Sequence, residues 1–193
     1  DAVKKGGRFV PQKHRRVRIS CKSRLAPLQF SLTPTKRDLE NLLKENEEKL
    51  RSALLLQDSL DEFEKLHDNP LFDARMEHSW AHRLLAQGKI ATEVEGEFSV
   101  IAINDNILLF AIPGELFSSV GKRIKKLDDT SISMVCGYSG GSLGYLPSAS
   151  SYLKGGYEVN QAYKYYGLAG PFSPDVEDII IETMKSLLKE VKL

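Results

Sequence analysis

Two segments of the chain place polar side chains directly after apolar stretches that are predicted to be strands. The first is Ile112-Pro113-Gly114-Glu115, and the second is the glycine-rich run of residues 137–145. Open α/β sheets bind ligands where neighbouring parallel strands end, so we expect both segments at one sheet edge. Glu115 would also stand at a helix N-terminus, where the helix dipole favours the ionised carboxylate. The sequence therefore predicts either a ligand site around Glu115 or a carboxylate that only favours the helix start.

The glycine-rich run also contains Gly137-Tyr138-Ser139-Gly140-Gly141, which fits the G-x-S-x-G nucleophile elbow of serine hydrolases. An elbow must open a helix, and its triad requires a histidine later in the chain. Gly144 and Pro147 disfavour a helix here, and the last histidine is His82. The glycines complete neither the G-x-x-x-x-G-K-S/T nor the G-x-G-x-x-G motif. A serine hydrolase and a nucleotide-binding site are therefore disfavoured.

Two histidines and one cysteine are further candidates. His78 and His82 are four residues apart and could hold a metal ion from one helix face. They lie about 160° from Trp80 around the predicted helix, and no Glu follows His78 to complete H-E-x-x-H. We expect an exposed pair that binds no metal, and we expect Cys136, inside an apolar strand, to be a small core residue.

The first half of the chain is predicted to hold one short strand and a helical region. Residues 17–21 alternate as a strand would, and Leu25-Ala26-Pro27-Leu28 is expected to lead into a helix start. Thr33 and Pro34 suit the N-cap and the first helical position of one long helix or two shorter ones. The apolar stripe of this region is Leu39, Leu42, Leu43, Leu50, Leu54, Leu60, Phe63 and Leu66. A further helix is predicted over residues 73–87, with Met76, Trp80 and Leu84 on its buried face.

The second half predicts the sheet. Residues 90–100 alternate as a strand with one solvent face, and residues 107–112 are apolar throughout, which predicts a strand buried on both faces. A helix with its inner stripe at Leu116, Phe117, Val120, Ile124 and Leu127 separates this strand from the next, over residues 131–138. Residues 173–193 form the last predicted helix. The order implies a crossover between parallel neighbours. We therefore predict an α/β fold whose mixed sheet contains a parallel strand–helix–strand unit flanked by helices, forming part of a domain.

Charge is distributed unevenly along the chain. Residues 1–24 carry nine Lys and Arg against Asp1, a net charge of +8, and the remainder carries 18 Lys and Arg against 25 Asp and Glu, a net charge of −7. A basic segment of this kind can bind an anionic surface. Because no aromatic platform or nucleic-acid motif accompanies it, we do not expect nucleic acid as a partner.

Length and composition bound the remaining classes. The chain has 193 residues, of which 41% are hydrophobic and 27% charged, as in a globular protein rather than a disordered or fibrous one. No apolar run approaches 18 residues, so no membrane-spanning helix is predicted. Two cysteines cannot build a disulfide framework and fit a reducing compartment, which favours a cytoplasmic location. Because the chain begins at Asp1 without a signal-peptide pattern, we expect a processed or truncated polypeptide.

Three motifs in series carry a family resemblance. They are Ile112-Pro113-Gly114-Glu115-Leu116-Phe117, then Gly144-Tyr145-Leu146-Pro147-Ser148, then Tyr152 followed by Gly155-Gly156-Tyr157-Glu158. Their order and spacing resemble the C-terminal part of the catalytic domain of neutral/alkaline, non-lysosomal ceramidases and their short relatives, over about residues 90–193.

The resemblance implies a zinc-dependent amidase that cleaves the N-acyl bond of a sphingoid lipid. In that family the Glu of the first motif and the first Tyr of the second are zinc ligands, which match Glu115 and Tyr145. The Tyr of the Tyr-Glu pair in the third motif is assigned to stabilising the transition state, and it matches Tyr157. Carboxylate and phenolate oxygens suit Zn²⁺, and a zinc ion with an open position makes bound water nucleophilic near neutral pH.

The resemblance also implies that part of the site lies outside this chain. The family's other two zinc ligands are histidines, and these, with a catalytic serine, come from an N-terminal half. We therefore expect residues 25–193 to be the C-terminal part of a ceramidase-like catalytic domain, residues 1–24 to be a basic flexible junction, and the N-terminal half to be the partner.

Alternatives to a ceramidase stay open. Ser148-Ala149-Ser150-Ser151 replaces the threonine- and glutamate-rich run of the well-studied ceramidases, so another amide or a lipid-like molecule is an alternative substrate. A second hypothesis is a non-catalytic binding or structural relative that keeps the scaffold. A third is an anion or nucleic-acid binder that uses residues 1–24, whose binding would depend strongly on salt.

Overall fold

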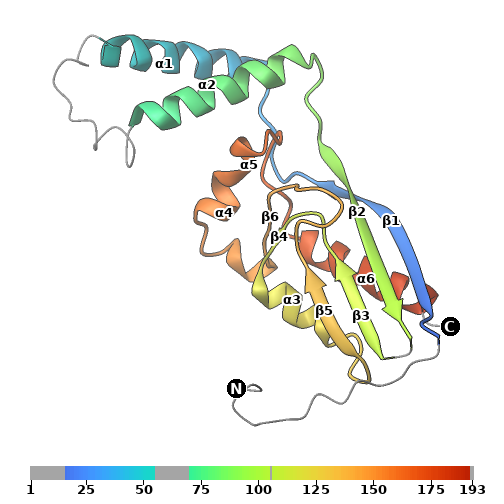
Figure 1. The fold of residues 1–193 in the computed structure, drawn as a ribbon. Helices are drawn as coiled ribbons and strands as arrows, with labels where there is room; N and C mark the ends of the chain where they lie inside the picture. Colours follow the sequence, from blue (N-terminus) through green and yellow to red (C-terminus); the bar gives the residue numbers. More distant parts are fainter. Residues whose placement is uncertain (1–15, 55–69, 105, 192–193) are drawn as a thin grey trace.

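A computed structural model of the chain describes residues 16–54, 70–104 and 106–191. Its main sheet has the strand order β1-β2-β3-β5, made by β1 (Ile19–Gln29), β2 (Glu93–Ile103), β3 (Ile107–Ala111) and β5 (Ile132–Cys136). The first three strands are antiparallel, whereas β5 is parallel to β3 and is reached through α3 (Ser118–Lys125) (Figure 1). The predicted α/β class, with a mixed sheet and a parallel strand–helix–strand unit, is confirmed.

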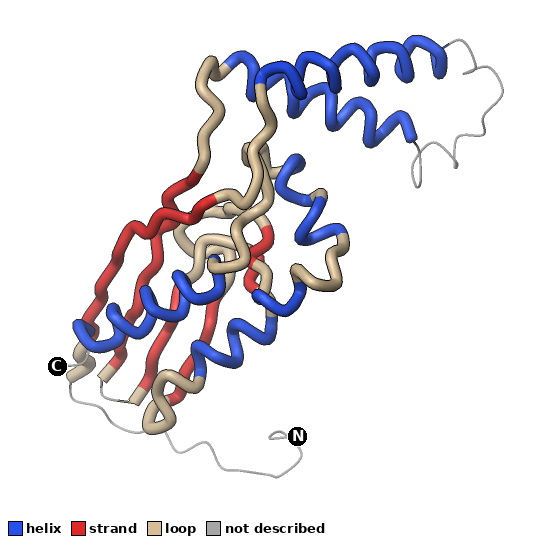
Figure 2. The backbone as a smooth tube through the Cα atoms, turned by 180° about the vertical axis from the view of Figure 1, so that it is seen from behind, coloured by secondary structure: helices blue, strands red, loops and turns tan. Residues whose placement is uncertain are grey.

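Helices α3 and α6 (Val176–Val191) cover one face of this sheet (Figure 2). The apolar residues of α6 recur every three or four positions, so they form one stripe that faces the strands. Its members are Val176, Ile180, Met184, Leu187, Leu188 and Val191, all buried in one core with Phe98, Val100, Leu108 and Phe110 of the sheet. This core is the platform on which the candidate site is built.

The opposite face of the sheet carries no covering element among the described residues. Where all four strands pair, alternation along the strands and the register place twelve uncharged side chains on this face, and the face continues along β1 and β2 with Leu25 and Glu97. The twelve are Ile19, Cys21 and Ser23 from β1, Ser99, Ile101 and Ile103 from β2, Ile107, Leu109 and Ala111 from β3, and Ile132, Met134 and Cys136 from β5. We call these twelve residues the open face. Ile19 is 67% exposed and Ile132 64%.

Two predictions about buried residues are wrong because of the open face. Residues 107–112 were expected to be buried on both faces, yet only the side chains of Leu108, Phe110 and Ile112 are fully enclosed. Cys136 was expected in the core, but it is exposed. An apolar strand must pack against another layer on at least one face of its sheet. Its sequence alone does not show whether the second face is covered as well.

β1 is longer than predicted. Leu25-Ala26-Pro27-Leu28, expected to lead into a helix, continues the strand opposite β2, with Ala26 and Leu28 buried. Pro27 is compatible with this because β1 lies at the edge of the sheet, where a strand can lack an N–H donor. The expected division of the chain between residues 24 and 25 therefore falls inside a continuous strand, and residues 1–15 lie outside the described residues.

A helical hairpin of α1 (Lys36–Leu54) and α2 (Pro70–Ala86) projects beyond the sheet (Figure 1). The helix predicted over residues 73–87 is confirmed, with Trp80 and Leu84 buried in a second core that includes Leu39 and Ala169. Leu60, Phe63 and Leu66 lie outside the described residues. None of the helices in the described part of the chain is long and apolar enough to cross a membrane.

The start of α1 differs from its prediction. Thr33 and Pro34 were expected to begin the helix, but Thr35 caps it instead. Asp38 N donates to Thr35 Oγ1 at 3.2 Å, and Thr35 N donates to Asp38 Oδ2 at 2.8 Å. This reciprocal pair is a capping box, with Asp where Glu or Gln is usual.

A second, two-stranded sheet lies beyond the ends of β3 and β5. It pairs β4 (Glu115–Leu116) with β6 (Tyr145–Leu146) in parallel, and Glu115 stands opposite Tyr145. Three short helices follow: η3 (Ala149–Ser151), α4 (Tyr157–Asn160) and α5 (Ala162–Tyr165). The sequence predicted that Glu115 stands at a helix N-terminus, and this prediction is wrong. Glu115 lies in β4, and α3 starts three residues later at Ser118.

Candidate functional site

Backbone hydrogen bonds hold the segment around Glu115 against the segment around Tyr145. Glu115 N donates to Gly144 O at 2.7 Å, and Phe117 N donates to Leu146 O at 3.2 Å. These bonds extend the edge at which β3 and β5 end, as expected for an open α/β sheet. The two glycine-containing segments singled out by sequence therefore meet side by side.

Gly114 permits this close approach. A Cβ atom at residue 114 would lie 2.6 Å from Gly144 O, closer than real Cβ atoms come to backbone atoms, and 3.1 Å from the Leu146 side chain. The glycine that precedes Glu115 is therefore required by packing between the two segments. Its place in the motif has a structural reason that is independent of chemistry at Glu115.

Three tyrosine hydroxyls surround the Glu115 carboxylate. The Tyr166 hydroxyl donates to Glu115 Oε1, and the Tyr138 and Tyr145 hydroxyls lie near enough to the carboxylate to lower its pKa. Burial works against ionisation, but the hydroxyls of Tyr166, Tyr138 and Tyr145 together outweigh it and hold the pKa of Glu115 below its ordinary value. Glu115 is therefore a carboxylate at neutral pH.

The same contacts keep the phenols protonated. The Glu115 carboxylate, followed by burial, raises the pKa of Tyr145, and the same two causes raise the pKa of Tyr166. Without a cation beside it, Tyr145 therefore offers a neutral hydroxyl oxygen. A divalent cation bound to the same oxygen would favour the phenolate instead.

Tyr157, the third predicted site residue, packs directly on Tyr145. The two rings lie edge to face, with centroids 6.1 Å apart and an interplanar angle of 77°. Partial burial raises the pKa of Tyr157, and the negative charges of Glu115 and Glu158 add to this. The structure thus brings Glu115, Tyr145 and Tyr157 together, while their catalytic and metal-binding roles stay predictions.

Sequence reasoning did not single out Tyr166 or Tyr138 as site residues. The Tyr166 ring lies against Gly144, where an added Cβ would come within 2.6 Å of it. Tyr138 has φ +53°, a left-handed conformation that is uncommon for a residue with a side chain. Tyr138 lies in the glycine-rich run and could have been suspected, whereas Tyr166 follows a short helix with no motif of its own.

A pocket of about 570 Å³ opens beside these residues. Glu115, Tyr138 and Tyr145 line it together with apolar side chains of Leu116, Phe117 and Val135, and with Lys122 and Lys125 from α3. A pocket with an apolar wall and a few convergent polar groups is the usual form of a small-molecule site.

The donors suit a divalent cation only in part. Glu115 and Tyr145 supply two adjacent oxygen donors, fewer than the four ligands usual for zinc. No group of three or more His, Cys, Asp or Glu side chains gathers within residues 16–54, 70–104 and 106–191. His82 is exposed on α2, and His78 lies there 3.7 Å from Glu47.

The disfavoured serine-hydrolase elbow has no support in the local fold. The described residues between Gly137 and Tyr145 contain no helix, although an elbow must lead into one. The Ser139 hydroxyl donates instead to Gly137 O, at 3.2 Å.

No protein-family model matches the chain, and no curated protein matches it. Solved structures similar to it include neutral ceramidase from Pseudomonas aeruginosa, with TM-score 0.35 and 16% identity, over 54% of this chain and 16% of the ceramidase chain. The chain thus corresponds to a small part of that enzyme's length. A similarity at this score carries no argument about activity, and the ceramidase-like family stays a prediction.

Proposed function

We propose that this chain supplies one side of the active site of a zinc-dependent hydrolase that cleaves an N-acyl amide of a lipid-like molecule. The observation that carries the proposal is the ionised Glu115 carboxylate held against Tyr145, with Tyr157 packed on the same ring. Glu115 and Tyr145 would hold the metal. When bound, zinc polarises a carbonyl oxygen and makes a water molecule nucleophilic near neutral pH.

The chain's own residues have separate tasks in this proposal. Tyr166 and Tyr138 orient the Glu115 carboxylate and keep it ionised through their hydroxyl groups. Tyr157 stays protonated and donates a hydrogen bond to the carbonyl oxygen of the substrate, where negative charge develops. Leu116, Phe117 and Val135 offer an apolar wall for an alkyl chain.

The remaining zinc ligands are proposed to come from an N-terminal half of the same protein. The open face supports this proposal, because it exposes the large apolar side chains of Ile19, Ile132 and Met134, and exposed apolar patches mark sites of interaction. A further layer packed there would complete the sheet's second core. The N-terminal half would then supply the two histidines that the family resemblance implies.

Amide hydrolysis by the full-length protein tests the proposal. N-Dodecanoylsphingosine and N-dodecanoylethanolamine should release dodecanoate, and Tyr157→Phe should lower kcat about 100-fold with little change in KM, because the lost hydrogen bond forms with developing charge. Tyr165→Phe is the matched control, since its ring packs on Tyr157 but its hydroxyl bonds Asp73. A full-length protein that folds but hydrolyses neither amide would favour the non-catalytic relative.

A further inference from the structure

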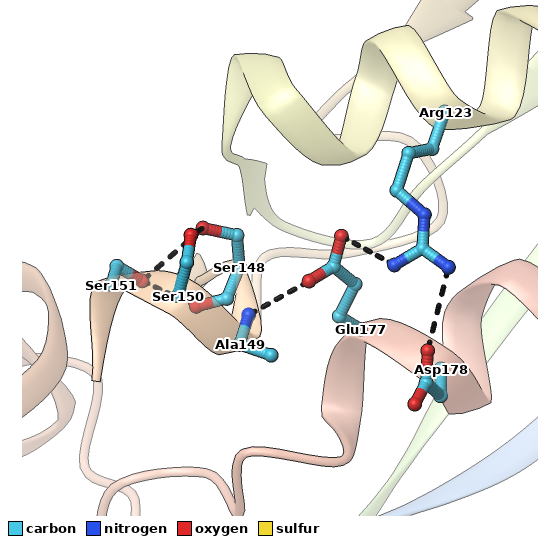
Figure 3. Close-up of polar contacts among 7 residues, drawn as sticks. All are labelled: Arg123, Ser148, Ala149, Ser150, Ser151, Glu177 and Asp178. Atoms are coloured by element: carbon cyan, nitrogen blue, oxygen red, sulfur yellow. Dashed lines mark hydrogen bonds and ion pairs between the residues drawn. The ribbon is translucent and has the colours of Figure 1, made fainter. Parts of the chain in front are cut away.

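Glu177, in the first turn of α6, is a buried carboxylate that the proposed chemistry does not use. Its side chain is 7% exposed. Glu177 Oε2 accepts a hydrogen bond from Ala149 N at 2.7 Å, and Glu177 Oε1 pairs with Arg123 Nη1 at 2.7 Å (Figure 3). The Arg123 guanidinium also reaches Asp178, at 3.5 Å.

The two partners of Glu177 come from the segments that follow the two strands of the small sheet. Arg123 belongs to α3, which begins two residues after β4. Ala149 opens η3, three residues after Leu146 at the end of β6. One carboxylate on α6 therefore ties down the continuation of both strands.

This tie matters because β4 and β6 are short. Each contributes two residues, and the backbone bonds from Glu115 N and Phe117 N join β4 to the segment of β6. Such a short ladder does not by itself fix how two segments lie. Contacts that hold α3 and η3 therefore add to the placement of Glu115 opposite Tyr145.

The serine hydroxyls of the η3 turn do not replace Glu177. Ser151 Oγ donates to Ser148 O at 2.5 Å, and Ser148 Oγ lies 3.2 Å from Ser150 Oγ (Figure 3). These hydroxyls satisfy one another and the turn's carbonyl group. The Ala149 N–H instead finds its acceptor on α6, 28 residues later.

A simpler explanation is that Glu177 only favours the start of α6 through the helix dipole. Asp178 lies in the same helical turn and would interact equally well with the helix dipole, yet its side chain is 75% exposed. A dipole effect does not require burial, whereas a carboxylate is rarely buried unless it is paired. The burial and the bond to Ala149 distinguish Glu177 from Asp178.

We propose that Glu177 is a positioning residue for the candidate site, holding α3 and η3 so that Glu115 and Tyr145 keep their opposition. The part of this inference that concerns zinc rests on the proposed function. The part that concerns the geometry of the tyrosine cluster does not.

Two measurements on the full-length protein test the inference. With ¹³C-labelled tyrosine, Glu177→Gln should shift the ring resonances of Tyr145 and Tyr166. It should also weaken zinc binding about tenfold in a chelator competition, as losses of supporting contacts at metal sites do. Asp178→Asn, the matched control, should change neither measurement.

The outcomes separate the inference from the proposed function. Unchanged tyrosine resonances and zinc affinity in a folded Glu177→Gln protein would overturn the inference. A wild-type protein without zinc would contradict the proposed function, while the tyrosine resonances would still decide the inference.

A second variant tests the inference if the Glu177→Gln protein does not fold. Arg123→Gln leaves the bond between Glu177 and Ala149 in place, so it should move the same tyrosine resonances by less. A lower melting temperature with unchanged tyrosine resonances would make the Arg123–Glu177 pair purely structural, and would also overturn the inference.

Discussion

Glu115 is the residue on which the proposed chemistry depends, and its charge is set by its neighbours. A carboxylate that accepts a hydrogen bond from one phenol and lies beside two others is stabilised in its ionised form. Because the pKa is lowered in the folded state, ionised Glu115 stabilises the fold above its unfolded-state pKa. This contribution is lost as the pH falls through the folded-state pKa.

The contribution of Tyr166 to this charge can be measured directly. Tyr166→Phe removes one hydroxyl donor, so the pKa of Glu115 should rise toward its ordinary value of 4.5, and zinc affinity should fall about tenfold. A pH titration of the ¹³C-labelled glutamate side chains reports the first effect. An unchanged pKa for Glu115 would show that Tyr166 does not stabilise the carboxylate.

At the scale of single elements, the cap of α1 gives a clear test. Thr35→Ala removes the hydroxyl that accepts from Asp38 N, and should lower the free energy of unfolding by about 1 kcal/mol. Thr33→Ala, at the residue that sequence alone predicted as the cap, should change stability by less than about 0.5 kcal/mol. Urea denaturation of both variants checks this, and a larger effect at Thr33 would favour the cap predicted from sequence.

The cap should also depend on pH. A hydrogen bond from the Thr35 side chain, followed by one from its backbone, lowers the pKa of Asp38. The capping box therefore stabilises α1 above the unfolded-state pKa of Asp38 and loses this effect as the pH falls through the lowered value.

Helices and strands could be predicted from sequence where their apolar residues repeat with the period of one buried face. The stripe of α6 and the alternation in β2 gave their positions because each has one buried face. That Pro27 lies within a strand could not be predicted. A proline is tolerated in a strand at the edge of a sheet, and the position of a strand in the sheet depends on tertiary structure. The contact between Tyr166 and Glu115 joins residues 51 positions apart, and no local pattern encodes it.

At the scale of the whole molecule, the open face indicates that the described fold has room for another layer. Uncharged side chains on four neighbouring strands form a continuous surface. Contiguous apolar patches of this kind mark sites of interaction. In the proposed assembly, the N-terminal half covers this surface.

A charge placed on the open face tests whether it is covered. Leu109→Lys in the full-length protein should lower the free energy of unfolding by about 3 kcal/mol, because a covered lysine would be a buried, unpaired charge. Leu153→Lys, at a 94% exposed position outside the sheet, is the control and should change stability little. Equal, small effects in the two variants would show that solvent reaches the open face.

The measurement that most directly tests the account is metal analysis of the full-length protein and its Glu115→Gln variant. Gln keeps the shape of the side chain and removes the charge that a zinc ion requires. We expect about one zinc per chain in the wild-type protein and none in the variant, with the same circular dichroism spectrum for both. Equal zinc content in the two proteins, or a folded wild-type protein that binds no zinc, would contradict the assignment of Glu115 as a ligand.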